Sequence, residues 1–282
     1  MIYLTLNNHD GSVEHYYHFL LGFLVPLVLW KKEYTVENSR KILLRSCEIM
    51  DRHLFEIGYK RANILDKVSH EVARTKKDHC RECIFVERVG YDKPSYYNFV
   101  DFSAANLILS EILSEDIARY TEKFNSNRIE DHPYIVMIDR EPPNHFYLSQ
   151  LCESQGSGRS RRSIQNYRNL FESVALQYKN VVSFTLEEKT LAFQIALFKQ
   201  ADVIIAQHGA ALANLIWCKP NTTVIEIHPL NISETIMNRN YFLNLANCMK
   251  LDYQRVEQEG CHSVVDPNSL LRILKNAIDG YR

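Results

Sequence analysis

Strand-like and helix-like patterns of apolar residues alternate in the first half of the chain. At positions 2–6 every second residue is apolar, which predicts a strand, and a polar turn follows it. From about Glu14 the apolar residues recur at helical spacing and share one face of a predicted helix. A strand, a polar loop and a buried helix in this order are typical of the start of an α/β layer fold. Weaker patterns predict strands at 41–44, 58–65 and 83–88 and a helix at 102–120.

The second half of the chain alternates more regularly. A polar segment at 126–132 predicts a linker, and the apolar run Tyr134–Ile138 after it is typical of a strand buried on both faces of a parallel sheet. Asp266 and Pro267 suit the N-cap and the first position of a last helix. The alternation of strands and helices predicts a Rossmann-like unit. Between these points we expect helix 166–178, strand 181–184, a helix that starts at a capping box at 185–188 and runs to 200, strand 202–206, helix 210–217 and strand 223–227.

These patterns predict an α/β protein of two domains, for which 282 residues are enough. We expect one Rossmann-like domain at 1–128 and a second at 129–262, with the boundary in the polar linker. The remaining segment, 263–282, is expected to form a C-terminal helix that could pack back on the N-terminal domain.

Composition narrows the classes of function. The 33 basic and 34 acidic residues give a net charge of −1, so no overall positive field favours nucleic acid, and a phosphate group must be bound by a local site. The apolar stretch 19–30 is too short for a transmembrane segment, and no Lys or Arg precedes it as it would in a signal peptide. The seven cysteines are scattered and odd in number, which favours a reducing compartment. We therefore expect a cytoplasmic protein of microbial or viral type, with a trimmed lumenal domain of a Golgi or ER protein as the alternative.

A first polar cluster lies where a predicted strand ends, the edge at which open α/β sheets bind ligands. His208 and Gly209 follow strand 202–206, and the small residues Ala210 and Ala211 begin the next helix. A phosphate could approach the backbone closely here and meet the free N–H groups of the helix. A tight turn without a ligand is the alternative.

Arginines form a second cluster. Arg140 follows the strand Tyr134–Ile138, and a Gly/Ser/Arg loop farther along contains Arg159, Arg161 and Arg162. Guanidinium groups bind phosphate in bidentate fashion, although a charged loop is more often simply solvated.

Glu226 interrupts the apolar strand 223–227, where a carboxylate could accept the two hydroxyls of a ribose. An edge-exposed strand residue is the alternative. Phosphate donors, guanidinium groups and such a carboxylate at three strand ends of one sheet together predict a nucleotide site. The sequence has neither the glycine fingerprint of dinucleotide-binding enzymes nor a P-loop, which argues against dehydrogenases, epimerases and P-loop NTPases. Cys80 and Cys83 lack the second pair that a structural zinc site requires.

The stretch 201–229, ADVIIAQHGAALANLIWCKPNTTVIEIHP, resembles the signature of glycosyltransferase family 61. The family pattern, His-Gly-Ala-x-Leu-x-Asn followed by Pro and a Glu-Ile/Val-x-Pro strand, is matched in order by His208, Gly209, Ala210, Leu212, Asn214, Pro220, Glu226 and Pro229. Other likenesses are the Arg-Arg-x-Ile-x-Asn pattern at 161–166, the strand-end Arg140 and the aromatic-aromatic-His-aromatic segment 16–19. The sequence departs from the family at Tyr167, where an acidic residue is usual, and at 25–27, where Leu-Pro-Arg is frequent.

The resemblance implies a GT-B fold, in which two Rossmann-like domains face each other across a cleft, a UDP-sugar donor and inversion at the anomeric carbon. Family members transfer N-acetylglucosamine, xylose or arabinose, and among these donors we favour UDP-xylose, with a glycan or glycoprotein hydroxyl as acceptor. An inactive glycan- or nucleotide-binding scaffold of the same fold is the alternative. The residues expected to bind the donor are Arg140, Arg161, Arg162, Asn166, His208, Gly209, Ala210, Ala211, Asn214 and Glu226.

An inverting transferase needs a general base for the acceptor hydroxyl, which is expected from the acceptor-side N-terminal domain. The candidates are Asp10, Glu14, His15 and His18, of which His18 matches the family pattern and belongs to the residue type most used as a base near neutral pH. The sequence has no Asp-x-Asp pair to hold a divalent metal on the diphosphate, and arginines with a helix terminus can take that role. We therefore expect no metal site, no required cofactor and no essential role for Mn²⁺ or Mg²⁺.

Overall fold

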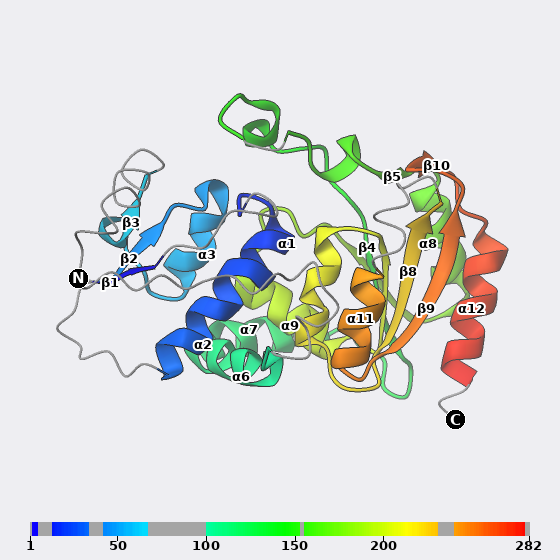
Figure 1. Ribbon diagram of the computed structural model, residues 1–282. Helices are drawn as coiled ribbons and strands as arrows, with labels where there is room; N and C mark the ends of the chain where they lie inside the picture. Colours follow the sequence, from blue (N-terminus) through cyan, green and yellow to red (C-terminus); the bar gives the residue numbers. More distant parts are fainter. Residues whose placement is uncertain are drawn as a thin grey trace. The chain divides into compact units, whose positions relative to one another are not determined.

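The computed structural model describes residues 2–4, 13–33, 42–66, 100–152, 155–230 and 240–279. The chain divides into two compact units, Met1–Leu113 and Ser114–Arg282 (Figure 1). Each unit combines helices with a parallel sheet, so the predicted mixed α/β class is confirmed. Within the ranges given above, no helix combines the length and the apolar character needed to span a membrane.

The first unit contains a three-stranded parallel sheet. Its strands β1 (Ile2–Leu4), β2 (Ile42–Arg45) and β3 (Ile64–Leu65) lie in the order β1-β2-β3. A long helical segment joins α1 (Tyr16–Phe19), a π-helical turn (Leu20–Leu24) and α2 (Val25–Glu33). The other elements are the short helices η2 (Glu48–Met50), α3 (Asp51–Glu56) and η3 (Arg61–Asn63), and α6 (Phe102–Ile112), which packs on α2.

Pro26 explains the π-helical turn. A proline ring inside an α-helix clashes with the carbonyl four residues earlier, here that of Gly22, and cannot donate a hydrogen bond to it. The wider turn shifts the bonding, since the Val25 N–H donates to the Leu20 carbonyl, and the helix continues past the proline. The helix predicted from about Glu14 is thus confirmed, with a local change of geometry.

The second unit is built on a five-stranded sheet in which all strands are parallel. The strands are β4 (Tyr134–Ile138), β6 (Asn180–Phe184), β7 (Val203–Gln207), β8 (Thr223–Pro229) and β9 (Asp252–Gln258), in the spatial order β6-β4-β7-β8-β9. Numbered along the chain this is the doubly wound order 2-1-3-4-5, whose switch point lies between β4 and β7. Ligands of such sheets bind at the carboxyl ends of the strands beside the switch point.

Helices cover both faces of this sheet (Figure 1). On one face, α8 (Tyr167–Gln177) packs on β6 and on α12 (Pro267–Asp279), and α12 also packs on β9. The strand residues that form a core with these two helices are Ile135, Met137, Val203, Ile205, Ile225, Ile227 and Val256. The other face carries α9 (Leu191–Gln200), the 3-10 helix η7 (Ala210–Trp217) and α11 (Tyr241–Cys248). Because side chains alternate along a strand, Glu226 and His228 point toward this second face.

Several predicted elements are confirmed, and their packing is now defined. The strands predicted at 2–6, 41–44, 134–138, 181–184, 202–206 and 223–227 correspond to β1, β2, β4, β6, β7 and β8. Asp266 caps α12 and accepts hydrogen bonds from the N–H groups of Asn268 and Ser269, both at 3.1 Å. The sequence allowed the last helix to pack on the N-terminal domain. In the structure α12 packs on α8 and β9. Helix α7 (Ser114–Asn125) is the first helix of the second unit and packs on α9 of the same unit.

Three predicted elements differ from the structure. In 58–65 only Ile64–Leu65 form a strand, and the helix expected at 102–120 is two helices that meet at Leu113. The capping box at 185–188 is wrong, because α9 begins at Leu191 with Thr190 as its N-cap, accepting the Phe193 N–H at 3.1 Å. The strand predicted at 83–88 lies outside the described residues.

Candidate functional site

Arg140 and His208 meet at the switch point of the second sheet. They follow the carboxyl ends of the neighbouring strands β4 and β7, in which Ile138 pairs with Ala206. The Arg140 guanidinium donates to the His208 carbonyl from Nη2 at 2.7 Å and to the Gly158 carbonyl from Nη1 at 3.2 Å. Arg162 donates to the same His208 carbonyl at 3.5 Å. Two guanidinium groups therefore lie together at the edge where this fold binds ligands.

The two arginines carry positive charge that is only weakly balanced. Burial lowers the pKa of Arg140 to about 10, and the neighbouring Arg162 adds to this effect. Burial and the nearby Arg161 lower the pKa of Arg162. Among the described residues neither side chain forms an ion pair, and both Nε atoms are buried without a hydrogen-bond partner. A pair of partly buried cations with spare N–H donors is suited to a multiply charged anion.

Gly209 gives the Arg140 guanidinium its space. A Cβ at this position would lie 1.8 Å from Nη2 and 2.9 Å from Cζ of Arg140. The backbone here is extended, so any residue could adopt it, and the glycine is required by the close approach of the side chain.

Replacing Gly209 with alanine should therefore push the guanidinium away from the His208 carbonyl. We expect affinity for a diphosphate ligand to fall by at least about tenfold, measured by calorimetric titration. In an Arg140→Met background the same Gly209→Ala change should have no further effect, because the displaced group is already missing. A Gly209→Ala variant with unchanged affinity would contradict this role.

The loop before β5 (Ser163–Ile164) is attached to the end of β4. Gly158 has φ +53°, and a Cβ on it would lie 2.2 Å from the Glu141 carbonyl oxygen. The Arg159 N–H donates to this carbonyl at 2.8 Å, and its side chain forms an ion pair with Asp139 at 2.6 Å. Arg159 is thus neutralised, whereas Arg161 is exposed at the edge of the pair formed by Arg140 and Arg162.

A buried cluster lies beside this site, around the Glu226 carboxylate. One carboxylate oxygen accepts hydrogen bonds from Nδ1 of His208 and from Nδ1 of His228, the latter at 3.1 Å. The other oxygen accepts from the Tyr253 hydroxyl and lies 3.8 Å from Nη2 of Arg255. Glu226 is 1% exposed, so both of its oxygens are enclosed by protein groups.

These contacts decide the charges in the cluster. Burial alone would raise the pKa of Glu226, but the hydrogen bonds from His208, His228 and Tyr253 outweigh burial and hold this pKa below its ordinary range. For His208 burial dominates and lowers the pKa, against the opposing effect of Glu226. Glu226 is therefore an anion and His208 a neutral imidazole near pH 7, with the Nδ1 proton on the side of the carboxylate.

His208, Glu226 and His228 are also the group of described residues best placed to hold a metal ion, with one ligand atom from each within 4.8 Å of the others. Two observations favour protons over a cation there. The Glu226 oxygen that would bind the ion already accepts both Nδ1–H groups, and Arg162 and Arg255 bring positive charge to the same carboxylate.

Two predicted donor-binding residues make structural contacts. Asn166 forms paired hydrogen bonds with the backbone of Val265, at 2.8 and 2.9 Å. Asn214 is fully buried; it donates to Gln194 and accepts from Trp217 Nε1, both at 2.9 Å. Their direct contact with a donor stays a prediction, as does that of Ala210 and Ala211, which are partly exposed at the start of η7.

The candidate bases belong to the first unit. Glu14 and His15 are buried, and His18 is partly buried in α1 with its ring against Tyr17 at 5.4 Å. Asp10 lies outside the described residues. A catalytic role for any of the four stays a prediction.

Three residues of the Glu226 cluster were missed by sequence analysis: His228, Tyr253 and Arg255. His228 could have been found, because it lies two residues after Glu226 and so on the same face of β8. The other two lie on β9, whose sequence DYQRVEQ has no apolar run to reveal a strand.

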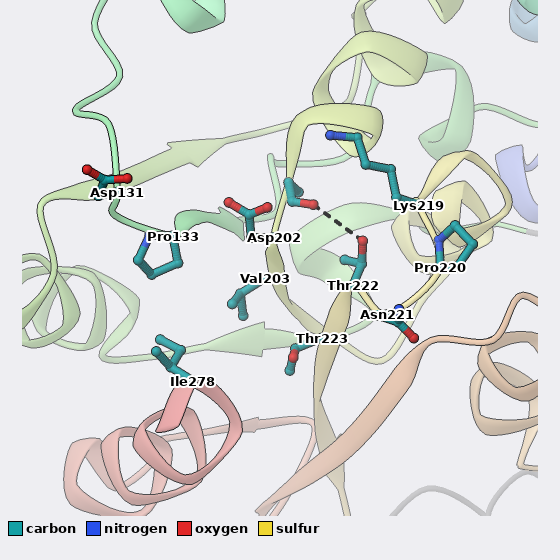
Figure 2. Close-up of a pocket in the computed structure, with 11 residues that line it drawn as sticks. Asp131, Pro133, Asp202, Val203, Lys219, Pro220, Asn221, Thr222, Thr223 and Ile278 are labelled. Atoms are coloured by element: carbon teal, nitrogen blue, oxygen red, sulfur yellow. Dashed lines mark hydrogen bonds between the residues drawn. The ribbon is translucent and has the colours of Figure 1, made fainter. Parts of the chain in front are cut away.

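The hollow in Figure 2, of about 390 Å³, lies at the opposite edge of the sheet. It is lined by the amino ends of β7 and β8 and by Ile278 of α12. Its polar groups serve the fold: Asp202 binds Arg128 and the Tyr134 N–H at 2.5 and 2.8 Å, and the Thr222 hydroxyl donates to the Ala201 carbonyl at 3.3 Å. Open α/β sheets bind ligands at the carboxyl ends of their strands, and this hollow lies at the amino ends. Its position and these contacts therefore both argue against a nucleotide site there.

The chain matches a known protein family. The family model described as Glycosyltransferase 61 matches residues 16–225. The chain is also similar to the beta-1,2-xylosyltransferase RCN11 of Oryza sativa subsp. japonica, with 24% identity over 133 residues. That match covers 44% of this chain and 24% of the rice protein.

Proposed function

Because the chain belongs to glycosyltransferase family 61, we propose that it is an inverting glycosyltransferase of GT-B type that uses a UDP-sugar donor. The family match supports glycosyl transfer, and the doubly wound second unit supports a nucleotide-sugar domain. The observation that carries the proposal is the pair of partly buried guanidinium groups of Arg140 and Arg162, which meet at the His208 carbonyl beside the switch point.

In this proposal the two arginines bind the donor diphosphate. Their charge is paired by no described carboxylate, so a diphosphate would supply the counter-charge that the protein leaves out. As the bond from the sugar to the diphosphate breaks, negative charge grows on the leaving oxygen. Cations that are already fixed in place stabilise this charge without reorganisation, which is the task that a divalent metal performs in other transferases. We therefore propose that no metal ion is required.

Inversion requires a single displacement in which the acceptor hydroxyl attacks from the face opposite the diphosphate. A base must take the hydroxyl proton, and we propose that Asp10, Glu14 or His18 of the first unit supplies it. The second unit then contributes donor binding and leaving-group stabilisation.

For the donor sugar we propose xylose, with UDP-N-acetylglucosamine and UDP-arabinose as the other candidates. Support comes from the rice protein, which is named a beta-1,2-xylosyltransferase. The acceptor is proposed to be a glycan or glycoprotein hydroxyl.

Thermal melting against a panel of nucleotides tests this function. UDP should raise the melting temperature more than GDP, CMP or ADP. The shift reports binding, because a ligand at about 100 times its Kd stabilises the folded state by about 2.7 kcal/mol. The shift should be the same in EDTA and in manganese. UDP-sugars that stabilise the protein are then assayed for UDP release with glycan acceptors. A melting temperature unchanged by every nucleotide would contradict the proposal, and binding of UDP without turnover would favour an inactive scaffold.

A further inference from the structure

The His208 ring is held in one orientation at the edge of the donor site. Its Nδ1 bonds to Glu226, and its ring packs edge-on against His228 and Phe242, with centroids 5.1 Å away in both cases. The carbonyl of the same residue is fixed by Arg140 at 2.7 Å. Side chain and backbone of His208 are thus both clamped, one by the buried carboxylate and the other by the guanidinium.

The remaining ring nitrogen, Nε2, is available. No residue in the described part of the chain hydrogen-bonds to it, and it is not fully enclosed, unlike Nε2 of His228. With the Nδ1 proton donated to Glu226, the neutral ring presents a lone pair at Nε2. A phosphate oxygen is also an acceptor, so the neutral ring can give it no hydrogen bond.

A bound diphosphate would change the balance of charges around the ring. The groups that act on His208 are the anion Glu226, the cations Arg162, Arg140 and Arg255, and the polar neighbours His228 and Tyr253. In the free protein burial is the main effect that opposes a charge on the ring, and the nearby arginine charge adds to it. A diphosphate would neutralise Arg140 and Arg162 and place its own negative charge beside the ring, so that it and Glu226 together favour the imidazolium form against burial.

We propose that His208 binds the donor diphosphate as an imidazolium ion, taking up a proton from solvent at Nε2 and donating it in a hydrogen bond to a phosphate oxygen. This inference rests on the proposed function. Glu226 is then a positioning residue, because it orients the ring and supplies the charge that balances the imidazolium. When UDP leaves, the proton returns to solvent, so the cycle needs no other reactant.

The role of the charged ring is electrostatic. Its hydrogen bond strengthens as negative charge develops on the leaving diphosphate, so it favours the transition state over the bound donor. The affinity for UDP should fall as pH rises between the two pKa values of His208, the low one of the free protein and the raised one of the complex. Within this window the expected fall is about tenfold per pH unit, because one proton is bound with each nucleotide.

Calorimetric titration with UDP in two buffers of different ionisation enthalpy tests the inference. At about pH 7.5 the terminal phosphate of UDP is already ionised, since the second pKa of a phosphate monoester is about 6. Any proton taken up must therefore come to the protein, and we expect up to about one per UDP. His208→Gln and Glu226→Gln should bind more weakly and take up no proton, whereas His262→Gln, at an exposed histidine, should behave as wild type.

Imidazole ¹⁵N spectra of the wild-type protein provide a readout that needs no variant. Free His208 should show a protonated Nδ1 and an unprotonated Nε2, and UDP should protonate Nε2. Tight UDP binding without proton uptake, or uptake that persists in His208→Gln, would overturn the inference and leave the proposed function intact. Failure of UDP to bind the wild-type protein would overturn both.

Discussion

Replacing Arg140 with methionine should weaken UDP binding by about 100-fold, because about 2.7 kcal/mol of charge-assisted hydrogen bonding is lost. Methionine keeps much of the side-chain volume and removes only the charge and the donors. The nucleotide-free protein should melt at an unchanged or higher temperature, since a partly buried cation without a counter-ion costs desolvation free energy. The lost bonds to the His208 and Gly158 carbonyls partly offset this gain.

The two measurements for this variant are calorimetric titration with UDP and thermal melting without it. Arg168→Met is the matched control, because Arg168 is an exposed arginine of α8 whose ion pair with Glu172, at 2.9 Å, is solvated. The control should match wild type in affinity. Unchanged UDP affinity in Arg140→Met would remove this arginine from the site, and a large loss of stability would show that it serves the fold instead.

Replacing Asn214 with alanine should destabilise the protein by about 3 kcal/mol, because each buried polar group left unpaired costs about 1–3 kcal/mol. The side chain is fully buried and bonds to Gln194, to the Ala211 carbonyl and to Trp217 Nε1. Removing it leaves the Gln194 and Trp217 groups without these partners in the core beneath η7.

Thermal or denaturant unfolding measures this loss, with Asn169→Ala on the exposed face of α8 as the control that should change little. The protein that remains folded should bind UDP with nearly wild-type affinity, because the hydrogen bonds of Asn214 to Gln194 and Trp217 join core residues to one another. A variant that keeps its stability but loses UDP binding would instead support the direct donor contact that the family resemblance implies.

Local patterns were sufficient to predict an element when its own environment restricts which residue types it can contain. The run Tyr134–Ile138 is apolar throughout because β4 is buried on both faces, so it was recognised without any knowledge of its neighbours. The cap of α12 was found for a similar reason, since Asp266 and Pro267 act on the first turn of their own helix.

Local patterns failed where a distant contact outweighed them. Residues 185–188 have the composition of a capping box, yet Glu187 bonds to the Glu141 N–H at 3.4 Å and Glu188 has φ 64°, so the helix starts later. Strand β9 has a polar, irregular sequence because it lies at the edge of the sheet, where β8 is its one partner among the described strands.

The same division applies to the candidate site. The sequence alone determined that Arg140 and His208 follow buried strands and that Gly209 is small, because these are properties of single segments. Only the tertiary structure decided that β7 lies beside β4, which brings the Arg140 guanidinium to the His208 carbonyl. It also decided that Glu226 faces inward to His208, His228 and Tyr253. Strand order and the partners of a buried charge depend on contacts between segments far apart in the chain, and no local pattern encodes them.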